Sequence, residues 1–376
     1  MPFLPTFYTV QVAFAPLPYP YLSALQSIEI ETSTEAPAMF RLRFELSKTP
    51  FGDWDVLQFD IFRPLVPIKV SVFLGSRPET IVNGYLNEAR LDNRSQPGAS
   101  VLEVVGMDAT ATLMALQEQP FPWPNLPDSA IAATVFGKYA IVPNSLPTPS
   151  ARTVLDVTTT QRTTDIRVLQ RMAERNAYEC YVQPDPILGM DVGHFHPAQL
   201  LMPPQAVLST DFGLATNLES FDVSYGMLRP TSALAVALDP ATRTPMPGIA
   251  AAALEPPLGL EPTLSRTLVP PVVRPAGTDA ANAAEVLAMA QSIANRSSRC
   301  IEGSGEVDGL RIGRVLRPGL PVTVRGAGRL HSGSYYVTSV NHSLSTERYT
   351  QSFRAWRNAV GLTGAELFID PFAAVS

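Results

Sequence analysis

The chain has 376 residues, of which 45% are apolar and only 16% are charged, and its formal net charge is −6. This length allows two or three domains, and the acidic pI near 5.4 disfavours nucleic acid as a partner, because phosphate binding needs a basic surface. No run of about 18 apolar residues occurs, so we expect no direct membrane insertion.

The N-terminal segment, residues 1–22, is apolar, but it carries no basic residue and is interrupted by prolines. A secretory signal needs a basic start followed by an unbroken apolar stretch. We therefore expect synthesis in the cytoplasm without a signal peptide.

Residues 38–115 have the pattern of β-strands. Phe40, Leu42 and Phe44 alternate with charged residues, which is typical of a half-buried strand. Three more strand-like segments follow with short connections, and this predicts an antiparallel meander. A helix of about two turns is expected to close the segment at 108–116.

The next segment, residues 121–205, predicts a small α+β unit. Asp128 is the predicted N-cap of a helix over 129–141, and Thr164 or Asp165 caps a second helix. The apolar stripe of that second helix consists of Ile166, Leu169, Met172 and Ala173.

Strand patterns return at 206–238 and again at 310–358. Between them, the proline-rich stretch 240–277 predicts an extended arm or a disordered loop. A helix rich in alanine follows, starting at Thr278 or Asp279. Its face of small residues would allow close packing on a sheet.

An internal similarity links the two strand-rich regions. From Val70 to Gly84 and from Val322 to Gly333, a strand and a turn lead to a strand that begins near glycine. A loop and a return strand then follow in both. This predicts two related antiparallel β domains that flank the α+β unit, in a fold class that is α+β and mainly β.

The predicted domain boundaries follow from these patterns. They are 1–120 for the first β domain with an N-terminal arm, 121–205 for the α+β domain, 206–358 for the second β domain with an insertion at 240–277, and 359–376 for a C-terminal tail.

His194 and His196 form the best candidate metal pair, because alternate residues of a strand share a face. A metal site needs a third ligand, for which Asp185 and Asp191 are near in sequence. A polar hairpin edge is the simpler interpretation. Cys180 matches no metal or redox spacing, nor does the second cysteine, Cys300, and we predict no cofactor.

The other two histidines, His331 and His342, lie in a stretch rich in tyrosine and arginine. A catalytic base needs a nucleophile and an orienting acid within reach. No nucleophile motif such as G-x-S-x-G occurs, so we predict that the chain is not an enzyme. His342 is interpreted as a hydrogen-bonded histidine within a strand.

Two segments resemble the phage late control protein D family. In the helix segment, the matching positions are Thr164, Asp165, Leu169, Gln170, Arg171, Ala173, Glu174, Asn176, Tyr178 and Tyr181. In the C-terminal segment, they are Leu316, Arg317, Pro318, Gly319, Gly333, Tyr335, Val337, Thr338, His342, Tyr349, Thr350, Phe353, Arg354, Arg357 and Asn358. The order of the segments agrees with that family over most of residues 38–358.

The resemblance implies a structural baseplate hub of a contractile injection machine, which is a phage tail, a tailocin, a type VI spike or an extracellular injection system. Such hubs are homotrimeric rings in which each copy carries two tube-type β-barrels. The ring adapts a sixfold tail tube to a threefold spike. The implied location is the baseplate of a phage tail or tail-like particle, in some cases one that is released from the cell.

The resemblance also implies partners. These are two further copies of the chain, the inner tail tube or a tube-initiator protein, and other baseplate and LysM-type adaptor subunits. Many relatives continue into an OB-fold and a β-helical needle, whereas this sequence stops soon after Asn358. The spike is therefore expected to be a separate protein. No lysozyme-like insertion is visible, so cell-wall cleavage is not expected.

Seven residues are interface candidates under this interpretation. They are Tyr335, Arg354, Arg357, Leu367, Phe368, Ile369 and Phe372. The last four belong to an apolar tail that would anchor the spike or the next ring. Two other functions remain open from the sequence: a β-rich carbohydrate-binding or carbohydrate-active protein, and a β-barrel that binds a small molecule.

Overall fold

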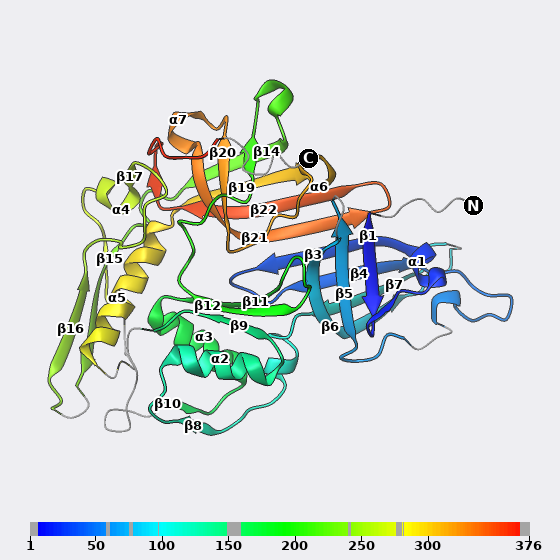
Figure 1. Ribbon diagram of the computed structural model, residues 1–376, viewed down its shortest axis with the longest axis horizontal. Coiled ribbons are helices and arrows are strands. Elements are labelled where there is room, and N and C mark those ends of the chain that lie inside the picture. The colour runs from blue at the N-terminus through cyan, green and yellow to red at the C-terminus, as the bar shows by residue number, and fades with distance from the viewer. Residues whose placement is uncertain are drawn as a thin grey trace.

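The computed structural model describes residues 7–57, 61–74, 78–96, 98–148, 159–239, 242–275, 280 and 282–368. Figure 1 shows two β-rich halves side by side, with a helical unit and a separate long helix packed against them. No helix in the described ranges is long and apolar enough to cross a membrane. The α+β, mainly β class predicted from the sequence is confirmed.

The first β half contains β1 (Tyr8–Val12), β2 (Ala15–Pro16), α1 (Tyr19–Ala24), β3 (Leu25–Ser33), β4 (Met39–Glu45), β5 (Pro67–Phe73), β6 (Pro78–Asp92) and β7 (Val101–Met107). The second contains β13 (Val207–Ser209), β14 (Leu218–Tyr225), β19 (Ile301–Asp308), α6 (Gly309–Ile312), β20 (Pro321–Arg325), α7 (Gly328–His331), β21 (Gly333–Ser345), β22 (Tyr349–Arg357) and β23 (Ala359–Val360).

The two halves share one strand order. It is β3-β4-β7-β6-β5-β1 in the first and β14-β19-β22-β21-β20-β13 in the second. Counted along the chain within each half, both orders are the same, so the predicted relationship between the β units is confirmed. They differ at one edge, where β1 is antiparallel to β5 but β13 is parallel to β20. Closure of each unit into a tube-type barrel stays a prediction.

An antiparallel pair, β21 and β3, joins the halves into one large sheet. Each half still has its own apolar core. Phe40, Leu42 and Phe44 are fully buried in the first core, as their alternation predicts. Val340 and Phe353 belong to the second.

The α+β unit lies between the halves in sequence. It contains β8 (Phe121–Trp123), α2 (Asp128–Lys138), β9 (Val142–Ser145), β10 (Thr159–Gln161), α3 (Asp165–Asn176), β11 (Glu179–Pro184) and β12 (Asp191–His196). Both long helices pack on the sheet β11-β12-β9, and the predicted stripe of α3 is buried there.

Two predictions about local structure were wrong. The N-cap of α2 is Pro127 rather than Asp128, whose carboxylate instead accepts a 2.6 Å hydrogen bond from Nε of Arg175. At 108–116 the helix is only a short 3₁₀ turn, Leu113–Ala115. There the carboxylate of Asp108 accepts hydrogen bonds from backbone N–H groups, including that of Ala38 at 2.7 Å, and so stabilises the turn.

The proline-rich stretch is folded in its described part, contrary to the predicted arm. It contributes β16 (Pro245–Ala250), β17 (Glu261–Pro262), α4 (Thr263–Arg266) and β18 (Val272–Val273). With β15 (Ser232–Leu238), two of these strands form a sheet in the order β16-β15-β18. Pro245 and Pro247 occupy alternate positions of the edge strand β16, where missing N–H groups can face away from the ladder.

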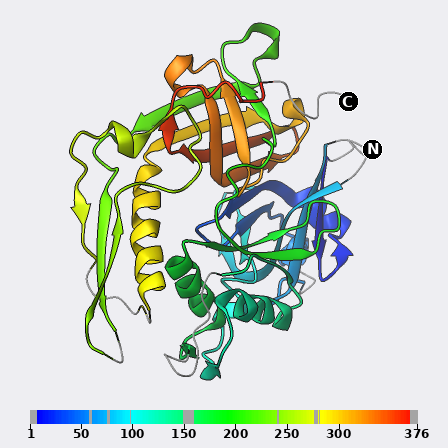
Figure 2. The ribbon, with the colours of Figure 1, turned by 60° about the vertical axis from the view of Figure 1, so that its left-hand side comes forward.

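The long helix α5 (Ala283–Ser298) covers one face of that sheet (Figure 2). Its alanines pack against those of β15, as the small-residue face predicts. The predicted starting residues, Thr278 and Asp279, lie outside the described residues. The helix begins after Asn282, whose side chain accepts from the N–H of Glu285 at 3.0 Å.

Candidate functional site: a charged cavity between the units

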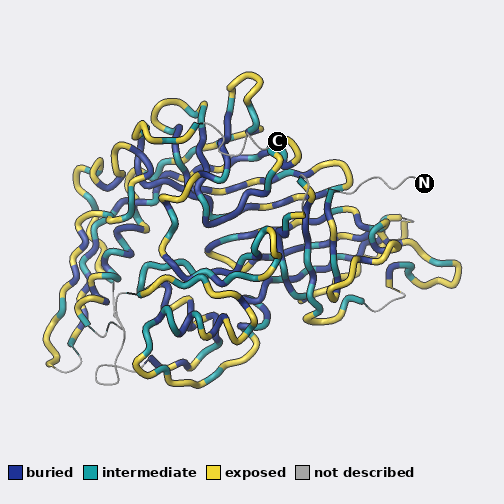
Figure 3. The backbone as a smooth tube through the Cα atoms, in the orientation of Figure 1, coloured by how far each residue is buried: buried dark blue, intermediate teal, exposed yellow. Residues whose placement is uncertain are grey.

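A cavity of about 920 Å³ lies where several parts of the chain meet. Its walls come from the β3–β4 turn, from α3 with the start of β11, from the outer face of β14, β19 and β22, and from the C-terminal half of α5, and the β16–β17 connection adds Glu255. Figure 3 shows that the strands of the two β halves are mostly buried or intermediate, whereas exposed backbone is concentrated in the connecting loops.

One wall is built on Arg299, just after α5. Its guanidinium lies over the ring of Trp356 with 4.4 Å to the centroid. It also binds the Glu255 carboxylate through both Nε, at 3.1 Å, and a terminal nitrogen. A bidentate ion pair beside an aromatic ring fixes the position of the guanidinium. Arg299 therefore neutralises Glu255 and covers the indole.

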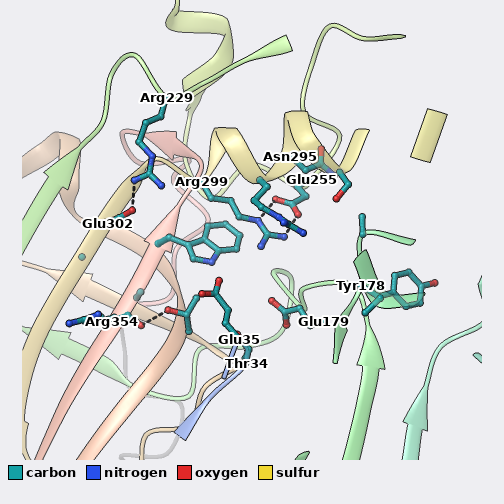
Figure 4. A pocket seen from close by; sticks show the side chains of 18 of the residues that line it. Thr34, Glu35, Tyr178, Glu179, Arg229, Glu255, Asn295, Arg299, Glu302 and Arg354 are labelled. Atoms are coloured by element: carbon teal, nitrogen blue, oxygen red, sulfur yellow. Dashed lines mark hydrogen bonds and ion pairs between the residues drawn. The ribbon is translucent and has the colours of Figure 1, made fainter. Parts of the chain in front are cut away.

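The carboxylate of Glu179, at the start of β11, faces the cavity (Figure 4). It accepts a hydrogen bond from the hydroxyl of Tyr336 on β21 at 2.5 Å. Burial raises the pKa of Glu179 to about 7, although the bond from Tyr336 and the charge of Arg299 act in the opposite direction. This contact ties the α+β unit to the second β half.

The rim carries further charges. Arg229 pairs with Glu302 across the mouth. Glu35, Glu174 and Asp222 also line the cavity and are exposed. Arg354 lines it from β22, but Figure 4 shows its guanidinium pointing away from the centre. The arrangement has ion pairs and carboxylates but no assembled nucleophile and base among the described residues.

His194 and His196 share a face of β12, as predicted, but this strand is central in its sheet and not a polar edge. Nδ1 of His194 lies 3.0 Å from Nε2 of His196, and Nδ1 of His196 lies 2.8 Å from the carbonyl of Pro197. Since that carbonyl can only accept, Nδ1 of His196 donates to it.

The rings of His194 and His196 are packed within the protein. Tyr181 stacks on His194 with 4.5 Å between the centroids. Burial and the neighbouring His196 lower the pKa of His194 to about 3. No group of three or more His, Cys, Asp or Glu residues in the described parts of the chain could hold a metal ion.

His342 is fully buried on β21, and its Nδ1 lies 2.9 Å from the hydroxyl of Tyr349. Burial, with the charge of Arg317, lowers its pKa to about 3. The prediction of a hydrogen-bonded strand histidine is confirmed. His331 ends α7 and accepts, through its carbonyl, a 2.7 Å bond from Tyr335.

The interface candidates occupy different environments. Tyr335 and Arg357 are fully buried within the chain, where Arg357 donates to the carbonyls of Ser332, Leu258 and Gly361 at 2.8–2.9 Å. Arg354 and Leu367 are exposed. The carbonyl of Phe368 accepts from Arg325 at 3.2 Å. Ile369 and Phe372 lie outside the described residues.

Arg317 has a structural role that the sequence did not predict, although it belongs to one of the matching motifs. Arg317 is buried and donates to the carbonyls of Thr80 on β6, at 2.8 Å, and Pro184 on β11, at 3.3 Å. The backbone N–H of Arg317 also donates to Oε1 of Gln205 at 2.8 Å. Arg317 thus connects both β halves and the α+β unit. An arginine next to proline and glycine at the start of a strand was the only available signal.

No family model and no curated protein matches the chain. Solved structures do match. A tail protein from Neisseria meningitidis is 14% identical, with 93% of this chain and 96% of that chain covered and a TM-score of 0.66. The 43 kDa tail protein of prophage MuSo2 from Shewanella oneidensis is 13% identical, with 94% and 99% covered and a TM-score of 0.67.

A component of the type VI secretion system of E. coli, itself described as similar to tail proteins of bacteriophage T4, is 14% identical. There 93% of this chain and 76% of that chain are covered, with a TM-score of 0.54. The similarity extends over nearly the whole chain in all three comparisons. The resemblance seen in the sequence is confirmed at the level of the fold: the chain has the fold of phage tail proteins and of a type VI secretion system component.

Proposed function

We propose that the chain is a structural baseplate hub that forms a trimeric ring and adapts a sixfold tail tube to a threefold spike. The observation that carries this proposal is the repeated strand order of the two β halves. Three copies of a duplicated unit present six similar units around one axis. Such a ring can meet a sixfold partner on one side and a threefold partner on the other.

The ends of the large sheet support lateral contacts between copies. Within the described residues, β14 is paired only with β19, and at the other end β1 is continued only by the two-residue β2. Unpaired backbone groups at a sheet edge can bind another strand. Neighbouring copies would use these edges, and the ring would present its other surfaces to the tube and the spike.

The proposed partners are a separate spike protein, the tail tube or its initiator, and further baseplate and LysM-type adaptor subunits. Exposed Arg354 and the tail around Leu367 are the proposed contacts, with Phe368, Ile369 and Phe372 continuing the tail. The role is mechanical and non-enzymatic, in the baseplate of a phage tail or tail-like particle. The fold shared with tail proteins supports this proposal.

Light scattering on the purified chain tests the proposal. A trimer of about 120 kDa is expected, three times the 40.7 kDa of one chain. Ring formation can depend on concentration, so the measurement is made over a dilution series. A mass that stays at one chain at all concentrations would contradict the trimeric hub.

A further inference from the structure

The cavity shown in Figure 4 is lined by more carboxylates than its own arginines neutralise. The acidic residues in its lining are Glu35, Glu174, Glu179, Asp222, Glu255 and Glu302, and the basic residues are Arg229, Arg296, Arg299 and Arg354. Two of these arginines already form ion pairs, Arg299 with Glu255 and Arg229 with Glu302. Outside these two pairs, the lining contains four carboxylates and two guanidinium groups.

The negative charge is concentrated around Glu179. Tyr336 of β21 donates to it, and Arg299 after α5 faces it, but Arg299 is bound by Glu255. Glu35, from the β3–β4 turn, and Glu255 both make ionisation of Glu179 less favourable and so raise its pKa. The Arg354 guanidinium points away in Figure 4. A cation entering the cavity would relieve this repulsion.

We propose that this cavity binds an organic cation, a guanidinium or ammonium group, with Glu179 and Glu35 as its counter-charges. The described residues offer no cluster suited to a metal ion. The volume of about 920 Å³ exceeds what one cationic head group fills and lies in the range of ligand pockets. As part of this proposal, the basic side chain is carried on a peptide segment of another protein, which would fill the volume beyond the head group.

The Trp356 ring in the lining offers no open face for a sugar. Carbohydrates usually stack on an open aromatic face, whereas the ring of Trp356 is covered by the Arg299 guanidinium and is only 6% exposed. Binding of a cation would also favour the ionised form of Glu179. Binding near pH 7 should therefore release a proton to the solvent.

Calorimetric titration of the full chain near pH 7 tests the proposal. The probe is the capped peptide acetyl-Gly-Arg-Gly-amide, and its neutral match is acetyl-Gly-Gln-Gly-amide. We expect the arginine peptide to bind at least roughly tenfold more tightly. Its binding enthalpy should differ between phosphate and Tris buffers, because a proton is released and taken up by the buffer.

Variants locate the site. Glu179→Gln should weaken binding of the arginine peptide roughly tenfold and remove the dependence on buffer. Glu35→Gln, in an exposed turn where folding is not at risk, should weaken it several-fold. Glu88→Gln, an exposed carboxylate on β6 outside the cavity, should leave it unchanged.

Three outcomes would overturn the proposal. They are no binding of the arginine peptide, equal binding of the two peptides, and binding that neither Glu179→Gln nor Glu35→Gln weakens. If spermidine binds tightly and the peptide does not, the proposed peptide occupant is wrong and the cavity takes a free polyamine instead. Binding of an uncharged trisaccharide in place of the peptide would overturn the cation itself. None of these outcomes depends on ring formation.

Discussion

Arg354 and Arg357 stand three residues apart on β22, and their surroundings are opposite. Arg354 is exposed, whereas Arg357 is fully buried and donates to three backbone carbonyls. Because those carbonyls lie in the α7–β21 connection, before β17 and after β23, the buried guanidinium holds three separate loops together.

Replacing Arg357 by methionine should therefore cost about 3 kcal/mol or more in the free energy of unfolding, since three buried acceptors lose their donor. Arg354→Met, the matched control, should stay within about 0.5 kcal/mol. Urea denaturation measures both. Equal effects of the two substitutions would show that burial of Arg357 is not what stabilises these loops.

Glu179 predicts a specific dependence of stability on pH. Its pKa rises from 4.5 in the unfolded chain to about 7 in the folded protein. The folded state therefore keeps a proton that the unfolded chain releases. This contribution to stability is fully present below pH 4.5 and is lost as the pH rises to about 7.

Glu179→Gln removes this titration. Between pH 5 and pH 8, wild-type protein should lose about 2 kcal/mol more unfolding free energy than the variant. Denaturation curves at both pH values test this, with Glu88→Gln as the control that should follow wild type. Parallel pH profiles of wild type and Glu179→Gln would contradict a protonated Glu179.

The sequence predicted the roles of single residues that act within one strand. It did not predict the roles of residues that bring distant segments together. The structural role of His342 follows from its strand pattern and is confirmed. Glu179, Glu255 and Arg299 come from three distant segments, so nothing in the local sequence marks their meeting. Arg357 matched a motif, but its burial depends on loops that the motif does not include.

At the scale of elements, the contact between α5 and β16 depends on one glycine. A Cβ on Gly248 would lie 2.7 Å from the backbone oxygen of Val286, closer than real Cβ contacts allow. Backbone atoms of a helix cannot move aside as a flexible side chain can. The helix and the sheet would have to separate.

Gly248→Ala should therefore destabilise the protein by about 1–3 kcal/mol through overpacking. The matched control is Gly137→Ala in α2, where a Cβ meets nothing within 4 Å. In a helix this change should be neutral or should stabilise by up to about 1 kcal/mol. Thermal unfolding of both variants gives the comparison, and a neutral Gly248→Ala would mean that α5 is not closely packed there.

Elements with a clear period were predicted well. The alternation in β4 and the stripe of α3 are both confirmed, because each buries one face against a core. The proline-rich stretch was interpreted wrongly, because prolines break most strands. Here they fall at alternate positions of an edge strand, and the pairing partner that makes this possible is β15.

At the scale of the whole molecule, the internal similarity between the β regions was the most informative feature of the sequence. It involved only three strands in each half, whereas the structure extends it to six in the same order. The added strands include β13, which is three residues long, and β14, which the insertion separates from β19. The strand pattern over 206–238 includes both, but their places in the strand order are visible only in the structure.

The charged cavity also depends on the fold of the whole molecule. Its walls come from several distant parts of the chain, so it exists only once the halves, the α+β unit and α5 are in place. The sequence contained the charged residues but no information on their convergence.

In the ring that we propose, three copies place six similar β units around one axis. Negative-stain electron microscopy of the purified chain, averaged without imposed symmetry, tests it most directly. We predict a ring with a central hole, threefold in its outer parts and close to sixfold around the hole. Compact single particles without a hole, or rings of another order, would contradict the trimeric ring.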